Sequence, residues 1–148
     1  MRITINPVEE IETAYKNGNF FTGFALAVTY FEREANQILS VFFHHRIPSD
    51  IIERWSLTTK FRIVCGLNLI GKNSHDKIRE IVDIRNRLIQ PTEREDKEKR
   101  RGDVFLRFRL NEKEKSSLLN FKECYTTLLL ADSRIFKEKF GDKGIRYL

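Results

Sequence analysis

The stretch FFTGFALAVTYFEREANQILSVFFH, residues Phe20 to His44, decides the fold of this chain. Apolar side chains recur along it at spacings of three and four residues, which is the period of one face of an α-helix. In its first half the opposite face is also apolar, because side chains such as Leu26 and Phe31 fill it. A helix that is apolar nearly all round lies in the centre of a fold or in an oligomer interface. The segment therefore predicts a long central helix.

Start and stop signals divide the rest of the chain into further helices. Asn6 followed by Pro7 predicts a capped helix start, and Asn17-Gly18 predicts the end of that helix. Downstream we expect a short helix near 51–55 and then a helix that is capped by Thr58 or Thr59 and runs to Leu69 or Ile70 before Gly71. Asn73 or Ser74 is expected to cap a helix that runs to about 89, and a last helix over about 112–140 is expected to end at Gly141. Because most connections are short, the prediction is an all-α, up-down helical bundle of four to six helices, forming a single domain over residues 1–148.

Residues 92–102 form the clearest internal loop. They contain the run EREDKEKRR, in which five basic and four acidic side chains nearly cancel. Such a run is typical of a charged, solvated loop, and the alternative is a nucleic-acid-binding patch. Residues 103–110 alternate apolar side chains with Arg107 and Arg109, which predicts either a short extended arm or a lead-in to the last helix.

Composition narrows the class of protein. A hydrophobic content of 41% argues against disorder, and a net charge of +6 is compatible with nucleic-acid binding without requiring it. Cys65 and Cys124 lie in apolar, helix-like runs, which is typical of reduced thiols in a cytoplasmic protein. The chain has neither CxxC nor HExxH spacing, so we expect no metal and no cofactor. It also has no signal peptide and no apolar run of about 18 residues, so we expect no membrane partner.

Arg85 breaks the pattern of the helix expected before residue 90. Apolar residues from Ile78 to Ile89 recur at helical spacing, and Arg85 falls in the middle of that stripe. A guanidinium group cannot be buried without partners, because its desolvation costs several kcal/mol. Glu32 interrupts the stripe of the long helix in the same way and is the predicted structural partner of Arg85. The alternative is that Arg85 faces a groove or a second subunit and receives a phosphate.

The segment IRNRLIQP, Ile84 to Pro91, resembles the motif of HEPN domains, in which an Arg, a polar residue that is often Asn, and a later His close a helix. The upstream LNLIG at 67–71 and the acidic Glu32 on a long early helix are similar to that family too. The resemblance covers roughly Asn19 to Gln90 and a helix after the loop. A weaker resemblance links the Leu-Ile-Gly and Ile-Arg-Asn runs to the mannitol operon repressor family.

The HEPN resemblance implies a helical bundle that forms a homodimer and brings two motifs together in a cleft. In active members, which are metal-independent ribonucleases, the His is assigned acid–base work on the ribose 2′-hydroxyl and the Arg holds the phosphate. Here Gln90 stands in the His position, and a carboxamide cannot act as a general base near neutral pH, although it can hydrogen-bond a phosphate or a hydroxyl. The implied RNA- or phosphate-binding set is Arg85, Asn86, Arg87 and Gln90. If the chain is an enzyme, Arg85, Asn86 and Gln90 are the catalytic candidates.

Four functional hypotheses remain open at this point. The first is a catalytically silent HEPN-like dimer that binds RNA or a protein partner in a regulatory or defence role, such as a toxin–antitoxin system. The others are a metal-independent endoribonuclease, a transcriptional regulator resembling the mannitol repressor, and a structural subunit without nucleic acid. Arg79 and Arg87 lie off the apolar stripe, so we expect them to be solvated or to contact an RNA backbone. His75 lies about 15 Å from Arg85 along the helix axis, and we expect it on the surface.

Overall fold

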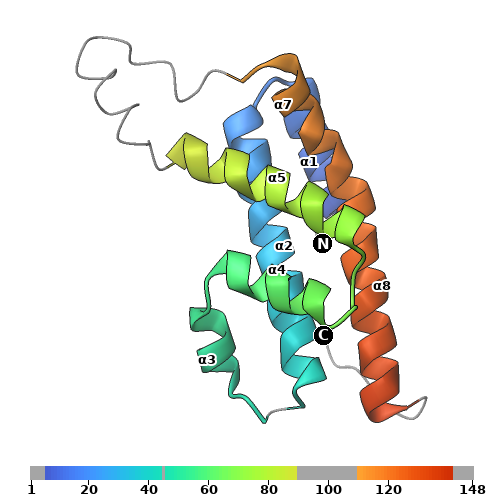
Figure 1. Cartoon of the computed structure of the whole chain (residues 1–148). Coiled ribbons are helices and arrows are strands. Elements are labelled where there is room, and N and C mark those ends of the chain that lie inside the picture. Colours follow the sequence, from blue (N-terminus) through green and yellow to red (C-terminus); the bar gives the residue numbers. More distant parts are fainter. Residues whose placement is uncertain (1–5, 45, 90–109, 142–148) are drawn as a thin grey trace, which may run out of the picture. The chain divides into compact units, whose positions relative to one another are not determined.

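The computed structural model describes residues 6–44, 46–89 and 110–141. Every regular element in these ranges is a helix, so the predicted all-α helical class is confirmed (Figure 1). The elements are α1 (Pro7–Lys16), α2 (Phe20–Phe42), α3 (Ser49–Arg54), α4 (Leu57–Gly66), α5 (Lys72–Ile89), α7 (Glu112–Ser117), the 3₁₀ turn η2 (Leu118–Asn120) and α8 (Phe121–Phe140). Because α7, η2 and α8 follow one another without a gap, the described ranges hold six helical segments.

Two predicted features lie beyond these ranges. The charged loop at 92–102 is outside the described residues, and so is the predicted arm at 103–110 except for its last residue, Leu110, which is buried. None of the described helices is both long enough and apolar enough to cross a bilayer.

The start of α1 confirms the helix signal read from the sequence. The side chain of Asn6 accepts hydrogen bonds from the backbone N–H of Val8 at 3.0 Å and of Glu9 at 3.4 Å, which satisfies two donors that a helix leaves unpaired at its N-terminus. Pro7 occupies the first turn. Gly18, at a φ of 72°, follows the end of this helix, because glycine adopts the left-handed region without steric cost.

The predicted bounds of α4 and the predicted start of α5 were wrong, whereas the predicted end of α5 near residue 89 is confirmed. Ser56 caps α4 by accepting from the backbone N–H of Thr59 at 3.2 Å, so the helix begins before both predicted caps. It ends at Gly66 rather than near residue 70, because Asn68 has a φ of 59° and asparagine tolerates this left-handed conformation. Helix α5 then begins at Lys72, so Asn73 and Ser74, the two predicted caps of this helix, lie inside its first turn.

The last predicted helix is interrupted by η2, where Leu118 is fully buried against α2. A Cβ atom built on Gly23 of α2 would lie 2.7 Å from Leu118 Cδ2 and 3.4 Å from the Cβ of Ala14. The absence of a side chain at Gly23 therefore permits a close approach between these elements. The helix predicted over 112–140 is correct in extent but contains this one tighter turn.

The chain divides into two compact units, each built from stretches that are far apart in the sequence. Unit 1 comprises Met1–Thr29 and Lys77–Lys122, and unit 2 comprises Tyr30–Asp76 and Glu123–Leu148. Buried apolar side chains of unit 1 include Ile11, Phe24, Ala27, Ile78, Ile81, Leu118 and Phe121. Those of unit 2 include Phe31, Ile38, Leu39, Ile52, Phe61, Leu128 and Ile135. A single domain over residues 1–148 stays a prediction.

Candidate functional site

The second half of α5, in unit 1, carries Arg85, Asn86 and Arg87, and all three are half-buried. The apolar stripe of this helix is buried, as Ile81 and Leu88 show. Arg85 occupies the same stripe, and its Nε is buried with no hydrogen-bond partner among the described residues. An unpaired buried donor costs about 1–3 kcal/mol, so this nitrogen is an unsatisfied polar atom within the buried stripe of α5.

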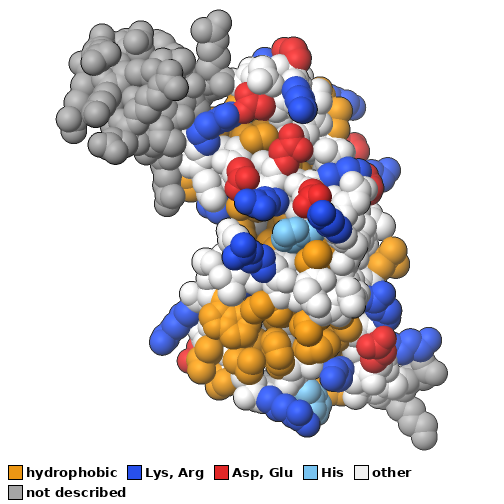
Figure 2. Space-filling view, viewed as in Figure 1, with side chains coloured by type: hydrophobic (Ala, Val, Ile, Leu, Met, Phe, Trp, Pro, Cys, Tyr) orange, Lys and Arg blue, Asp and Glu red, His pale blue; other side chains and the backbone are white. Residues whose placement is uncertain are grey.

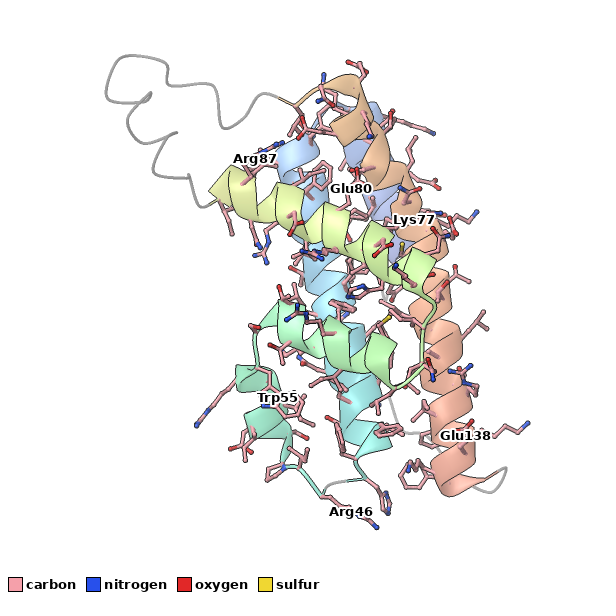
Figure 3. The ribbon with its side chains drawn as sticks, in the orientation of Figure 1. Arg46, Trp55, Lys77, Glu80, Arg87 and Glu138 are labelled. Atoms are coloured by element: carbon pink, nitrogen blue, oxygen red, sulfur yellow. The ribbon has the colours of Figure 1, made fainter. Side chains whose placement is uncertain are left out.

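Arg87 is held by an acidic side chain instead of being solvated. Its Nη2 donates to Glu114 Oε2, and both side chains are half-buried. Figure 3 labels Arg87 near the end of α5. Glu114 also closes a capping box at the start of α7, since its Oε1 accepts from Asn111 N at 3.1 Å and its own N–H donates to Asn111 Oδ1 at 2.8 Å. Arg87 therefore links α5 to α7 within unit 1, and a phosphate would have to compete with Glu114 for its guanidinium group.

Two further polar residues of α5 were expected on the surface. The exposed side chain of Arg79 has its Nε 3.9 Å from Asp83 Oδ2, one helical turn away, so the prediction that Arg79 is solvated is confirmed. His75 is half-buried, with Nδ1 3.8 Å from Asp76 Oδ1, so it lies only partly on the surface where it was expected.

The carboxylate of Glu32 forms an ion pair with Lys60 in unit 2. Lys60 Nζ lies 3.9 Å from Glu32 Oε2 and donates to the backbone carbonyl of Glu53 at 3.2 Å. The Lys60 side chain is only 1% exposed, so these contacts offset part of the cost of desolvating its ammonium group. Arg85 belongs to unit 1, so the predicted pair of Glu32 with Arg85 would join the two units, and it stays a prediction.

The buried Lys60 was missed by the sequence analysis, although the sequence contains the signal. Lys60 precedes Val64 by four residues, and both side chains are buried on α4. A charged residue inside an apolar stripe is the criterion that singled out Arg85, and applied to α4 it would have identified Lys60 as well.

Gln90 lies outside the described residues, so its place in the motif rests on the sequence alone. No group of three or more His, Cys, Asp or Glu side chains in the described part of the chain is arranged to hold a metal ion. Cys65 is half-buried and Cys124 is buried, and the structure joins neither to another cysteine of the described residues in a disulfide.

A separate groove of about 550 Å³ lies in unit 2, between α8 and the connection from α4 to α5. Arg134 lies beside it and donates from Nη2 to the backbone carbonyl of Leu69 at 3.0 Å. None of the residues from the α5 motif lines this groove.

The described residues are close to electrically neutral. They hold 17 Lys and Arg against 15 Asp and Glu, a net charge of +2 out of the +6 of the whole chain. Nucleic-acid binding by this part of the protein would therefore depend on particular side chains such as Arg85 more than on a general basic surface. Comparisons of the chain with protein-family models, with curated proteins and with solved structures found no match.

Proposed function

We propose that this chain is a HEPN-like dimeric helical module without nuclease activity, which binds RNA in a regulatory or defence role. The observation that carries the proposal is the state of Arg85: a half-buried guanidinium group on the apolar stripe of α5, with a buried Nε that has no hydrogen-bond partner among the described residues. Phosphate oxygens fit such a group, because the planar guanidinium presents several N–H donors in a fixed geometry.

The residues beside Arg85 support phosphate binding more than catalysis. Asn86 is half-buried next to it and carries an amide that can donate to a phosphate or a ribose hydroxyl. The position that would supply an imidazole in an active HEPN domain is Gln90, which does not titrate near neutral pH. The proposed module therefore holds RNA and leaves its backbone intact.

The test compares Arg85→Ala with Arg79→Ala, a matched control that removes one positive charge from the same helix at an exposed position. Binding of a fluorescent single-stranded RNA is measured by anisotropy at low and moderate salt. We expect Arg85→Ala to weaken binding about tenfold or more, the equivalent of about 1–3 kcal/mol, while Arg79→Ala changes it only a few-fold. Equal losses would mean that only bulk charge matters and would refute a site at Arg85. Circular dichroism establishes that both variants remain folded.

The endoribonuclease alternative is separated by incubating excess protein with the same RNA in the presence of a chelator. We expect no cleavage. Cleavage by the wild type that disappears in Arg85→Ala would show that the chain is an endoribonuclease and not a catalytically silent module. Duplex DNA bound more tightly than the RNA would favour the regulator that resembles the mannitol repressor, and binding to neither nucleic acid would leave the protein-partner or structural role.

A further inference from the structure

In unit 2, the ends of α2, α3 and α8 present two groups of aromatic rings, with contacts between the rings inside each group. Ring centroids are 5.2 Å apart for Phe42 and Phe43 and 6.3 Å apart for Phe43 and Trp55. On α8 the Phe136 and Phe140 centroids are 4.9 Å apart, and the His44 ring lies 5.1 Å from that of Phe140. We call these six side chains the aromatic surface: Phe42, Phe43, His44, Trp55, Phe136 and Phe140.

Much of this aromatic area remains accessible to solvent. His44 and Phe140 are exposed, Phe140 to 37%, and the other four rings are half-buried. Figure 2 shows one broad apolar area on this part of unit 2, and Figure 3 labels Trp55 there. Aromatic side chains bury large areas and dominate protein interfaces, and monomeric proteins seldom leave a large continuous apolar patch without a use.

The charges beside the aromatic surface are mixed in sign. Arg46 and Arg54 are exposed near the ends of α2 and α3, and Lys139 Nζ lies 5.0 Å from the centroid of the Phe42 ring. Exposed Glu53 and Glu138 lie among these cations in the sequence. Over its described residues, unit 2 holds nine Lys and Arg against eight Asp and Glu, so it is nearly neutral.

This distribution favours a second copy of the chain over a strongly charged partner. Net charge alone does not separate the two units, but the buried, unpaired guanidinium nitrogen that supports a phosphate site at Arg85 has no counterpart among the described residues of unit 2. A nucleic acid would therefore find only cations balanced by neighbouring carboxylates beside the aromatic surface. In a twofold contact, by contrast, the same patch faces itself, so the cations of one copy can lie against the carboxylates of the other around an apolar centre. We propose that two copies of this chain associate through the aromatic surface of unit 2.

This interface differs from the one that the sequence suggested. The sequence pointed to the Phe-rich first half of α2, but there Phe24 is fully buried in the protein and Phe21 is the exposed large apolar side chain, at 46%. The proposal rests on the proposed function only for the expectation of a dimer. It places the contact in unit 2, whereas Arg85 belongs to unit 1.

Sedimentation velocity without RNA, combined with fluorescence, tests this interface. Trp55 is the only tryptophan of the chain, so its emission reports directly on the aromatic surface. We expect a dimer at about 10 μM or above, and a shift of the emission to shorter wavelength as concentration rises and water leaves Trp55. A wild-type protein that stays monomeric at about 100 μM, or a dimer whose Trp55 emission does not depend on concentration, would overturn the proposal.

Three variants locate the contact. Phe140→Glu places a charge on the aromatic surface at the last residue of α8 and should raise the dimer dissociation constant at least about tenfold. Leu130→Glu is the matched control, because Leu130 lies on the same helix, is 67% exposed and lies outside the aromatic surface, so this variant should dimerise normally. Phe21→Glu tests the first half of α2. A dimer lost in Phe21→Glu but retained in Phe140→Glu refutes the interface proposed here.

RNA binding is measured separately on the same samples. If Arg85→Ala does not weaken RNA binding while the protein remains a dimer, the proposed function is refuted and this interface is not. Retained RNA binding by a strictly monomeric wild-type protein would refute this interface and the dimeric part of the proposed function, but it would leave the RNA site at Arg85 standing.

Discussion

The ion pair between Lys60 and Glu32 can be measured with a double-mutant cycle that uses Lys60→Met and Glu32→Gln. Lys60 is almost fully buried, whereas the Glu32 side chain is 46% exposed. Methionine keeps most of the volume of lysine without its charge, and glutamine keeps the shape of glutamate. The cycle therefore isolates the electrostatic part of this contact.

The expected magnitude follows from the distance and the exposure. Two unit charges 3.9 Å apart attract by about 4 kcal/mol at an effective dielectric constant of about 20. Solvent around Glu32 screens this attraction, and fully exposed pairs contribute only about 0.2–1 kcal/mol. Because Lys60 is buried, we expect an intermediate value, so that Glu32→Gln lowers the free energy of unfolding by about 1–2 kcal/mol in the wild type. In the Lys60→Met background the same change should have almost no effect.

Urea unfolding at neutral pH, followed by far-ultraviolet circular dichroism, gives the four free energies. A coupling energy below about 0.3 kcal/mol would refute the reasoning, because it would mean that the pair does not hold in solution. A second cycle with Arg85→Met and Glu32→Gln measures the pair that the sequence predicted. A coupling above about 1 kcal/mol there would support Arg85 as a partner of Glu32.

Three further changes test other parts of the structure. Burial, followed by the charge of Glu34, raises the pKa of Tyr125 above its usual value of 10.0, so the phenol stays protonated in the folded state while it ionises in the unfolded state. This contribution to the free energy of unfolding is complete below about pH 10 and falls as the pH rises further. In urea unfolding measured above that pH, the free energy of unfolding of Tyr125→Phe should therefore decrease less steeply with pH than that of the wild type. An equal decrease in both proteins would contradict this prediction. Gly23→Ala should destabilise the wild type by about 1–2 kcal/mol, because the new methyl group clashes with Leu118. In the Leu118→Ala variant, which lacks this clash, the same change should stabilise the protein by up to about 1 kcal/mol through the higher helix propensity of alanine. Additive effects of the two substitutions in urea unfolding would rule out this close contact. Asn111→Ala removes the capping box of α7 and should cost about 1 kcal/mol in the same assay, whereas an unchanged unfolding midpoint would show that the cap does not contribute.

Helix bounds could be predicted wherever the signal is local. Asn6 before Pro7 sets the start of α1, and Gly141, at a φ of 67°, follows the end of α8 as expected. The end of α4 could not be found in this way, because Gly71 offered a good stop signal while the chain leaves the helix earlier, at an asparagine that adopts the left-handed region. Which of several permitted stops is used depends on packing, which the local sequence does not specify.

For the candidate site, the sequence could predict only which face of its own helix a residue occupies. The spacing of apolar residues places Arg85 on the buried stripe of α5, and its half-buried state agrees with that position. The ion-pair partners of these side chains could not be predicted in this way, because they lie on other helices. Glu114, which holds Arg87, is 27 residues away in the sequence, and Lys60, which pairs with Glu32, lies on α4. No periodicity within one helix could have supplied either contact.

The division of the chain between the two units limits how it can be dissected. Each unit draws on residues from both sides of 90–109, so a fragment that ends at residue 89 contains neither unit complete. Truncation is therefore a poor way to assign RNA binding to one half of the protein. Separately produced fragments of residues 1–89 and 110–148 would have to find each other before either hydrophobic core could close, which makes split-protein complementation the appropriate way to study its assembly.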